Sequence, residues 1–187
     1  FPNPSVGAVI VKDNNVISTG WTQPGGRPHA EIVALNKNKE KNNNAILYTT
    51  LEPCSHFGKT APCVDAIIKS KIKRVVIAIK DPNPQVNGRS IKKLKRNNVQ
   101  VKVGVLKKEA ENINLGFFKK IKKNQINVNT KIATSKNGKM TNPNNKWITS
   151  ELARSYGHFL RAKHDAIASG INTIMNDNPL LTCRLPG

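Results

Sequence analysis

The sequence predicts an α/β fold in which helices cover both faces of a mostly parallel sheet. Along the first 125 residues, short aliphatic runs typical of buried strands alternate with segments of helical period. Residues that favour turns (glycine, proline and asparagine) separate these segments. The pattern restarts near Gln125, which predicts a second α/β unit. A chain of 187 residues is long enough for one ordinary domain and part of another.

The chain is expected to begin with a β-hairpin and a helix. Residues 6–11 and 16–21 are hydrophobic runs separated by an Asp-Asn-Asn turn, so they predict two paired strands. A loop rich in glycine and proline follows at 23–28. A helix is then expected from near His29 through Leu35.

Strands and helices continue to alternate after this start. A strand, a crossover helix and a second strand give parallel pairing, with helices packed on the sheet. The expected elements are strand 45–51, helix 63–70, strand 73–79, helix 90–97, strand 99–105 and helix 107–123. In the second unit we expect strands at 128–134 and 165–170 and a helix from Ser150 through Arg161.

The formal net charge of +20 has two interpretations. Lys and Arg number 31 against 11 Asp and Glu, which favours nucleic-acid binding. The alternative is a compositional bias spread over the whole surface. We favour the bias, and expect no nucleic-acid partner, because aromatic residues are only 5% and do not interleave with the basic runs. A basic surface could still attract a phosphorylated small substrate.

Hydropathy and cysteine usage indicate a location in the reducing cytoplasm. No apolar run approaches the roughly 18 residues that a membrane helix needs. No signal-peptide pattern is visible at the N-terminus, although the chain starts at Phe1 without a methionine. Three cysteines, an odd number, fit free thiols that are available to bind metal.

One histidine and two cysteines predict a catalytic zinc site. His29 and Cys63 are each expected at the start of a helix, and Cys54 follows a predicted strand. An imidazole and two thiolates suit Zn²⁺, and three protein ligands leave the fourth tetrahedral position for water. Glu31, two residues after His29, can move protons without being a ligand. The helix dipoles are expected to lower the thiol pKa.

Each of these residues alone has an ordinary structural explanation, but their combination is specific. His-x-Glu followed by Pro-Cys-x-x-Cys is typical of zinc-dependent nucleobase deaminases. Here eight residues, rather than two, separate Cys54 from Cys63. Three hypotheses follow: a metabolic deaminase, a deaminase of nucleic acid (tRNA-type) or free nucleosides, and a structural zinc module without catalysis. The open ligand position and Glu31 count against the structural module. Cys183 is expected to be a spare thiol.

Several motifs point to one family. They are Pro2-Asn3-Pro4-Ser5-Val6-Gly7, His29-Ala30-Glu31, the segment Leu51–Cys63 with its Ser-His-x-Gly-Lys-Thr insert, Asp81-Pro82-Asn83-Pro84, Asn114-Leu115-Gly116-Phe117, Trp147-Ile148-Thr149-Ser150 and the segments 170–174 and 177–184. With these motifs, essentially the whole chain resembles RibD, the family of bifunctional riboflavin-biosynthesis proteins. The insert between the cysteines distinguishes this family from simple cytidine and tRNA adenosine deaminases.

The resemblance implies two domains and two activities. A cytidine-deaminase-like three-layer α/β/α domain over residues 1–125 would deaminate 2,5-diamino-6-ribosylamino-4(3H)-pyrimidinone 5′-phosphate. Residues 126–187 would be the truncated start of a dihydrofolate-reductase-like domain, which reduces the ribosyl side chain to ribityl with NADPH. The sequence is therefore expected to be a fragment, which by itself should neither bind NADPH well nor reduce substrate. The family also implies a homo-oligomer.

The resemblance assigns roles to individual residues. It makes Glu31 the proton donor and His29, Cys54 and Cys63 the zinc ligands. The NADPH contacts would be Thr134, Trp147, Thr173 and Asp177. The substrate contacts would be Asn3, His56, Lys59, Asn145, Arg161, Leu181 and Arg184, with Asn3 near the base. The charge of Lys59 suggests the substrate phosphate as its partner.

Overall fold

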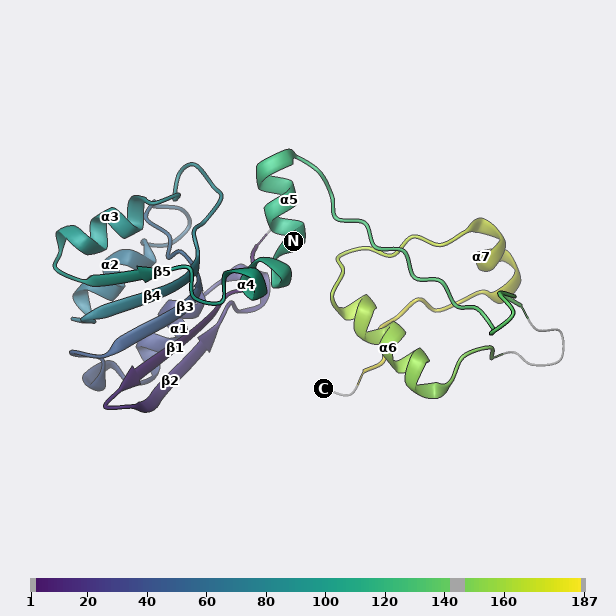
Figure 1. The fold of residues 1–187 in the computed structure, drawn as a ribbon, viewed down its shortest axis with the longest axis horizontal. Coiled ribbons are helices and arrows are strands. Elements are labelled where there is room, and N and C mark those ends of the chain that lie inside the picture. Colours follow the sequence, from purple (N-terminus) through teal and green to yellow (C-terminus); the bar gives the residue numbers. More distant parts are fainter. Residues whose placement is uncertain (1–2, 142–146, 186–187) are drawn as a thin grey trace. The chain divides into compact units, whose positions relative to one another are not determined.

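A computed structural model describes residues 3–141 and 147–185 of the chain. The chain divides into two compact units, Phe1–Asn127 and Val128–Gly187 (Figure 1). None of the helices described is long and apolar enough to cross a membrane.

The first unit is built on a five-stranded mixed sheet in the order β2-β1-β3-β4-β5. Its strands are β1 (Gly7–Lys12), β2 (Asn15–Trp21), β3 (Ile46–Leu51), β4 (Arg74–Ile79) and β5 (Gln100–Val103). β1 pairs antiparallel with both β2 and β3, whereas β3, β4 and β5 run parallel. The predicted hairpin and strands are present, but the sheet is not mostly parallel as expected. The hairpin is the reason, because it inserts β1 between two strands that run the opposite way.

Three helices cover one face of this sheet. They are α1 (Ala30–Lys37), α2 (Cys63–Lys69) and α3 (Arg89–Arg96). Ile10 of β1, Leu47 of β3 and Ile77 of β4 are fully buried against them. Burying a large aliphatic side chain contributes about 1.5–3 kcal/mol, so this core supplies most of the hydrophobic stabilisation of the unit.

The remaining two helices lie on the other face. α4 (Lys107–Ile113) and α5 (Leu115–Lys123) share a smaller core with Ala78, Ile79 and Leu51. Successive residues of a strand point to opposite faces of the sheet. Ile77 accordingly belongs to the main core and the next residue, Ala78, to the smaller one. Helices therefore cover both faces, as expected. The single helix predicted over 107–123 is interrupted at Asn114, whose φ of −112° is not helical.

Gly20 in β2 lets α1 lie directly on the sheet. A Cβ at this position would overlap the carbonyl oxygen of Ala30 and the backbone nitrogen of Ala34. Only glycine permits this approach, and it fixes where α1 begins. Two short 3₁₀ turns, Pro24–Gly26 and Lys39–Lys41, flank the helix.

Within residues 128–141 and 147–185, the second unit forms the helices α6 (Glu151–Ala162) and α7 (Ile171–Asp177). Ser150 caps α6, since its hydroxyl accepts from the Ala153 N–H at 3.3 Å. The predicted strands at 128–134 and 165–170 are wrong, because neither segment pairs with another in the part of the chain that the structure describes. A strand needs a hydrogen-bonded neighbour, which the aliphatic pattern cannot supply. The helix α7 was not predicted.

Candidate functional site

Three side chains that are distant in the sequence meet at one end of the first unit. His29 is the N-cap of α1, Cys63 is the first residue of α2, and Cys54 lies just beyond β3. The nitrogen and sulfur atoms that could bind a metal all lie within 4.8 Å of one another. His29 Nδ1 is 3.2 Å from Cys63 Sγ and 3.6 Å from Cys54 Sγ.

This donor set fits zinc. Tetrahedral Zn²⁺ with bonds of about 2.0–2.3 Å separates neighbouring ligand atoms by roughly 3.6–3.8 Å, close to the observed nitrogen–sulfur distances. Over residues 3–141 and 147–185, no fourth His, Cys, Asp or Glu joins this group. A zinc ion held here would keep one coordination position open, which distinguishes catalytic from structural zinc sites.

The two thiols differ in acidity. The pKa of Cys54 is lowered to about 4 by hydrogen bonding from the Cys63 thiol and by the nearby His29. The backbone N–H of Cys63, at the start of α2, also donates to Cys54 Sγ at 3.2 Å. The pKa of Cys63 is instead raised by its hydrogen bond to Cys54 and by burial. The backbone N–H at the start of α2 thus helps to stabilise the thiolate of Cys54. The pKa of His29 is raised, chiefly by its hydrogen bond to Cys54.

Glu31 lies in the first turn of α1 and is almost completely buried, with 4% of its surface exposed. Burial, together with the charge of the neighbouring Cys54 thiolate, raises the pKa of its carboxyl group to about 7. A carboxyl group with this pKa can both accept and release a proton at neutral pH, as a general acid–base requires.

Glu52 fixes the loop that carries Cys54, and we did not predict this role. Its carboxylate accepts hydrogen bonds from Ser90 Oγ at 2.7 Å, from the Gly88 N–H at 3.0 Å and from the Asp81 N–H at 3.4 Å. It therefore ties the end of β3 to the loop between β4 and α3. The signal available in the sequence was an acidic residue at the end of a buried strand, directly before Pro-Cys.

Asn3 lines a cavity of about 350 Å³ together with Pro4, Ser5 and residues 21–26. Its amide donates to the Gly25 carbonyl at 3.3 Å. Gly26 permits this position, because a Cβ there would overlap the Asn3 side chain. The buried Asn114 holds the same segment, accepting from the Ser5 N–H at 2.7 Å and donating to the Ser5 carbonyl at 2.8 Å. The roles of Gly26 and Asn114 were not predicted.

The loop between the two cysteines presents the predicted substrate residues His56 and Lys59, and both are exposed. Arg27 reaches this loop from the other side and donates to the Thr60 hydroxyl. Its charge also lowers the pKa of His29, so the guanidinium lies within electrostatic range of the metal ligands. Arg27 was not predicted as a site residue.

In the second unit, three predicted substrate residues come together around Thr182. Arg161 Nη1 donates to the Thr182 carbonyl at 2.9 Å, and Arg184 Nη1 donates to its hydroxyl at 2.8 Å. Leu181 precedes Thr182 with a φ of +52°. Asn145 lies outside the described residues.

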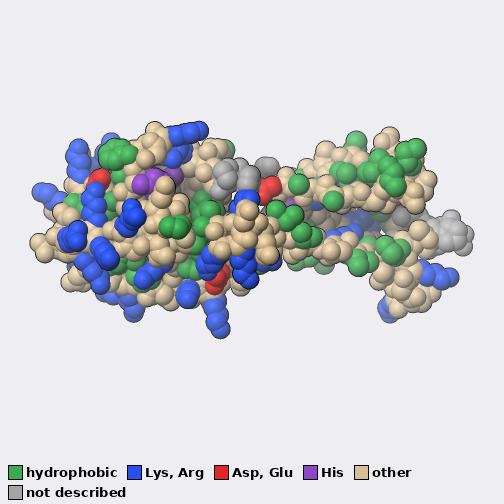
Figure 2. All heavy atoms as spheres, turned by 90° about the horizontal axis from the view of Figure 1, so that it is seen from above, with side chains coloured by type: hydrophobic (Ala, Val, Ile, Leu, Met, Phe, Trp, Pro, Cys, Tyr) green, Lys and Arg blue, Asp and Glu red, His purple; other side chains and the backbone are tan. Residues whose placement is uncertain are grey.

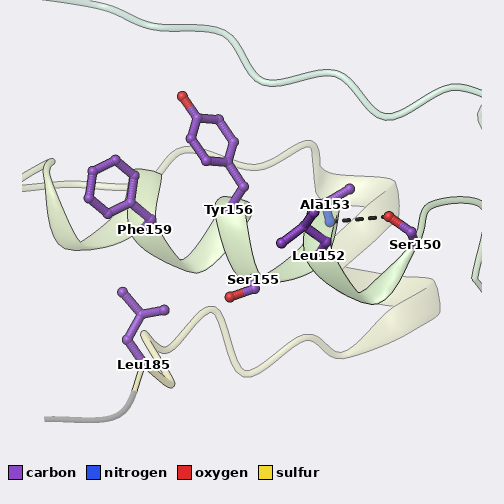
Figure 3. A pocket seen from close by; sticks show the side chains of 7 residues that line it. All are labelled: Ser150, Leu152, Ala153, Ser155, Tyr156, Phe159 and Leu185. Carbon is purple, nitrogen blue, oxygen red and sulfur yellow. Dashed lines mark hydrogen bonds between the residues drawn. The ribbon is translucent and has the colours of Figure 1, made fainter.

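The predicted NADPH contacts are exposed. Thr134 lies in a segment without regular structure, Thr173 and Asp177 lie on α7, and Trp147 stacks against the Arg154 guanidinium at 4.6 Å. These exposed side chains do not by themselves enclose a dinucleotide. A groove of about 700 Å³ runs along α6 (Figure 3). Its lining is mainly apolar and includes Leu152, Tyr156, Phe159 and Leu185.

Basic side chains are spread over the first unit. In the face shown in Figure 2, Lys and Arg side chains lie scattered among larger areas of other residues.

Two known families match the two units. Residues 1–79 match the cytidine and deoxycytidylate deaminase zinc-binding region, and residues 127–187 match the RibD C-terminal domain.

Individual relatives agree with this assignment. The chain is 45% identical to the riboflavin biosynthesis protein RibD of Aquifex aeolicus over 98% of its own length and 52% of that protein. It is 52% identical to the diaminohydroxyphosphoribosylamino-pyrimidine deaminase of Buchnera aphidicola from Acyrthosiphon pisum, over 65% of this chain and 82% of that protein. The chain thus spans about half the length of most of the curated relatives it matches.

Solved structures are also similar. The diaminohydroxyphosphoribosylaminopyrimidine deaminase/5-amino-6-(5-phosphoribosylamino)uracil reductase of Thermotoga maritima matches with a TM-score of 0.91 and 41% identity, over 98% of this chain and 54% of that one. RibD of Acinetobacter baumannii matches with a TM-score of 0.88 and 38% identity, over 99% of this chain and 52% of that one.

Proposed function

The chain belongs to the RibD family, and on this premise we propose that its first unit is a zinc-dependent deaminase of riboflavin biosynthesis. Its substrate is 2,5-diamino-6-ribosylamino-4(3H)-pyrimidinone 5′-phosphate, and its products are ammonia and the corresponding pyrimidinedione. The buried Glu31 beside the group of His29, Cys54 and Cys63 is the observation that carries this proposal.

His29, Cys54 and Cys63 hold the metal in the proposed mechanism. Zinc supplies an activated water as the nucleophile, because it lowers the pKa of bound water to about 7. Glu31 would accept the proton released from this water and pass it to a ring nitrogen. It would then take a second proton, from the hydroxyl group added to the ring, and pass it to the amine, which departs as ammonia. Its burial supports this role, since a carboxyl group with a pKa of about 7 carries a proton part of the time at neutral pH.

Asn3 contacts the pyrimidine base in this proposal, and His56 and Lys59 lie near the ribose phosphate. Three features support the place of Asn3: its cavity, the contact with Gly26, and the short distance in sequence from Gly26 to His29. The exposed loop with His56 and Lys59 follows Cys54 directly, which supports a role for both side chains near the substrate.

For the second unit we propose the first part of an NADPH-dependent reductase domain, with a boundary near residues 125–126. Thr134, Trp147, Thr173 and Asp177 contact NADPH, and Asn145, Arg161, Leu181 and Arg184 contact the substrate. The cluster of Arg161 and Arg184 at Thr182 supports a substrate side in this unit. The reductase activity belongs to the whole protein, of which a chain of this length forms about half in the relatives. We further propose a cytoplasmic homo-oligomer without a nucleic-acid partner; the three free cysteines support a reducing compartment.

Ammonia release from zinc-loaded protein tests the deaminase. The diaminopyrimidinone ribotide should release ammonia, whereas cytidine and adenosine should not. A parallel reaction with NADPH reports reduction through loss of absorbance at 340 nm. Ammonia from cytidine or adenosine alone would contradict the proposed substrate. Tight RNA binding that weakens steeply with salt would favour a nucleic-acid deaminase instead.

A further inference from the structure

Arg27 has unused hydrogen-bonding capacity at the rim of the metal site. It is half-buried and stands two residues before His29. One of its five N–H donors bonds to the Thr60 hydroxyl. The ion pairs among the described residues, Lys93–Asp65 and Lys122–Glu111, do not include Arg27. The guanidinium is therefore held in place by a neutral partner and keeps its charge available for a ligand.

Gly58 lies close against this guanidinium. A methyl group on Gly58 would lie 3.3 Å from Arg27 Nη2 and 3.9 Å from His56 Nε2. Two nitrogen atoms thus border the place where any other residue would carry its side chain. Lys59 follows directly in the sequence and is exposed on the same loop. Arg27 and His56 thus bring nitrogen donors together beside Gly58.

We propose that Arg27 is a specificity-determining residue that binds the 5′-phosphate of the substrate together with the loop that carries Gly58. This inference rests on the proposed deaminase function and extends it to a residue outside the shared motifs. A guanidinium presents parallel N–H donors that match phosphate oxygens, and charge-assisted bonds of this kind are about twice as strong as neutral ones. His56 and Lys59 contribute further donors to the same group.

The competing explanation is mechanical: Arg27 could simply brace the loop through Thr60. Two variants separate the explanations. Thr60→Val removes the brace and keeps the charge, whereas Gly58→Val keeps the charge and pushes a side chain against the guanidinium and His56. Arg27→Ala removes charge and brace together. Lys69→Ala is the control for loss of one surface charge, because Lys69 is exposed at the far end of α2.

Deamination kinetics with the ribotide and with its dephosphorylated riboside provide the test. Arg27→Ala and Gly58→Val should raise KM for the ribotide about 10- to 100-fold and leave KM for the riboside within about twofold. Thr60→Val should change both substrates equally, and Lys69→Ala should change neither. The proposal is overturned if Arg27→Ala raises both KM values by the same factor, or if Thr60→Val reproduces the selective loss.

A binding measurement separates this proposal from the proposed reaction. Ribose 5-phosphate can be titrated calorimetrically into the zinc-loaded proteins without any turnover. The wild type and Lys69→Ala should bind it, and Arg27→Ala and Gly58→Val should bind it at least tenfold more weakly. Equal affinity in all four proteins would refute the phosphate site even if deamination were observed. Selective loss would support the site even if neither pyrimidine were deaminated.

Discussion

Asn114 bonds to both backbone groups of Ser5, although 109 residues separate them in the sequence. Its Oδ1 accepts from the Ser5 N–H and its Nδ2 donates to the Ser5 carbonyl, as a neighbouring strand would do. The break between α4 and α5 thereby fixes the segment that carries Asn3.

Replacing Asn114 by leucine should therefore cost stability. The variant leaves two partly buried backbone groups without their partner, and we expect a loss of about 1–3 kcal/mol in the free energy of unfolding. Urea denaturation followed by circular dichroism measures this. Asn97→Leu is the matched control, because Asn97 is exposed and its side chain bonds only to the Lys93 carbonyl four residues away. Equal losses in the two variants would show that the bonds to Ser5 contribute nothing specific.

Gly26→Ala should weaken substrate binding through Asn3. The new methyl group overlaps the Asn3 side chain, so KM for the ribotide should rise about tenfold or more. Gly25→Ala is the control, because Gly25 also has a positive φ, +76° against +83° for Gly26. A Cβ on Gly25, however, would meet nothing within 4 Å. Both variants therefore carry the strain of an alanine at positive φ, and only Gly26→Ala also disturbs Asn3. Similar KM values for the two variants would remove Asn3 from the binding site.

Glu31→Gln should separate metal binding from catalysis. The amide is nearly isosteric and Glu31 is not among the three grouped ligands, so zinc content and unfolding should remain as in the wild type. Ammonia release should fall by roughly 10²- to 10⁴-fold, the usual contribution of a general acid–base group. Zinc analysis and a coupled ammonia assay measure the two effects. Turnover within tenfold of the wild type would refute the proposed proton transfer.

Cys54→Ser should abolish zinc binding. After dialysis against a weak chelator, the wild type should retain one zinc per chain and the variant none, because the thiolate with the lowered pKa is lost. Cys183→Ser provides the matched control, since Cys183 is exposed in the second unit and its thiol bonds to the His158 carbonyl. Loss of zinc from both variants, or from neither, would contradict the proposed ligand set.

Asp81→Asn should make stability less dependent on pH. Burial raises the pKa of the Asp81 carboxyl group from 3.8 to about 6. A raised pKa in the folded state stabilises the protein below pH 4, and this contribution is lost as the pH rises through 6. The variant keeps an acceptor for the Asn83 N–H but no charge, so it should be more stable than the wild type at pH 7.5, by up to about 3 kcal/mol.

At pH 4.5 the difference between Asp81→Asn and the wild type should shrink to less than half. Urea denaturation of both proteins at each pH measures this, and effects shared by the two proteins cancel in the comparison. A constant difference at the two pH values would show that Asp81 does not titrate in this range.

The sequence predicted the local features of the site. His29, Cys54 and Cys63 could be found because each stands beside proline at the edge of a recognisable helix or strand. The partners of Glu52 could not, since Ser90 lies 38 residues away and serine is common at the start of any helix. Asn114 was hidden in the same way: its pattern fitted a continuous helix, and only the distant Ser5 explains the break.

In the second unit, the sequence predicted strands that are not formed in the described residues. Residues 128–134 have the aliphatic pattern of a strand, but a strand exists only where a neighbour supplies hydrogen bonds, and periodicity says nothing about the neighbour. In contrast, Ser150 is a local capping signal, and the helix predicted from it is present.

The bonds between Ser5 and Asn114 have a consequence for synthesis on the ribosome. At about 5–20 residues per second, Asn114 is made some 5–20 s after Ser5. Within this interval His29, Cys54 and Cys63 are translated and β1, β2 and β3 can pair, while the segment with Asn3 still lacks its anchor. A nascent chain should therefore acquire its metal ligands before it acquires its pyrimidine contact.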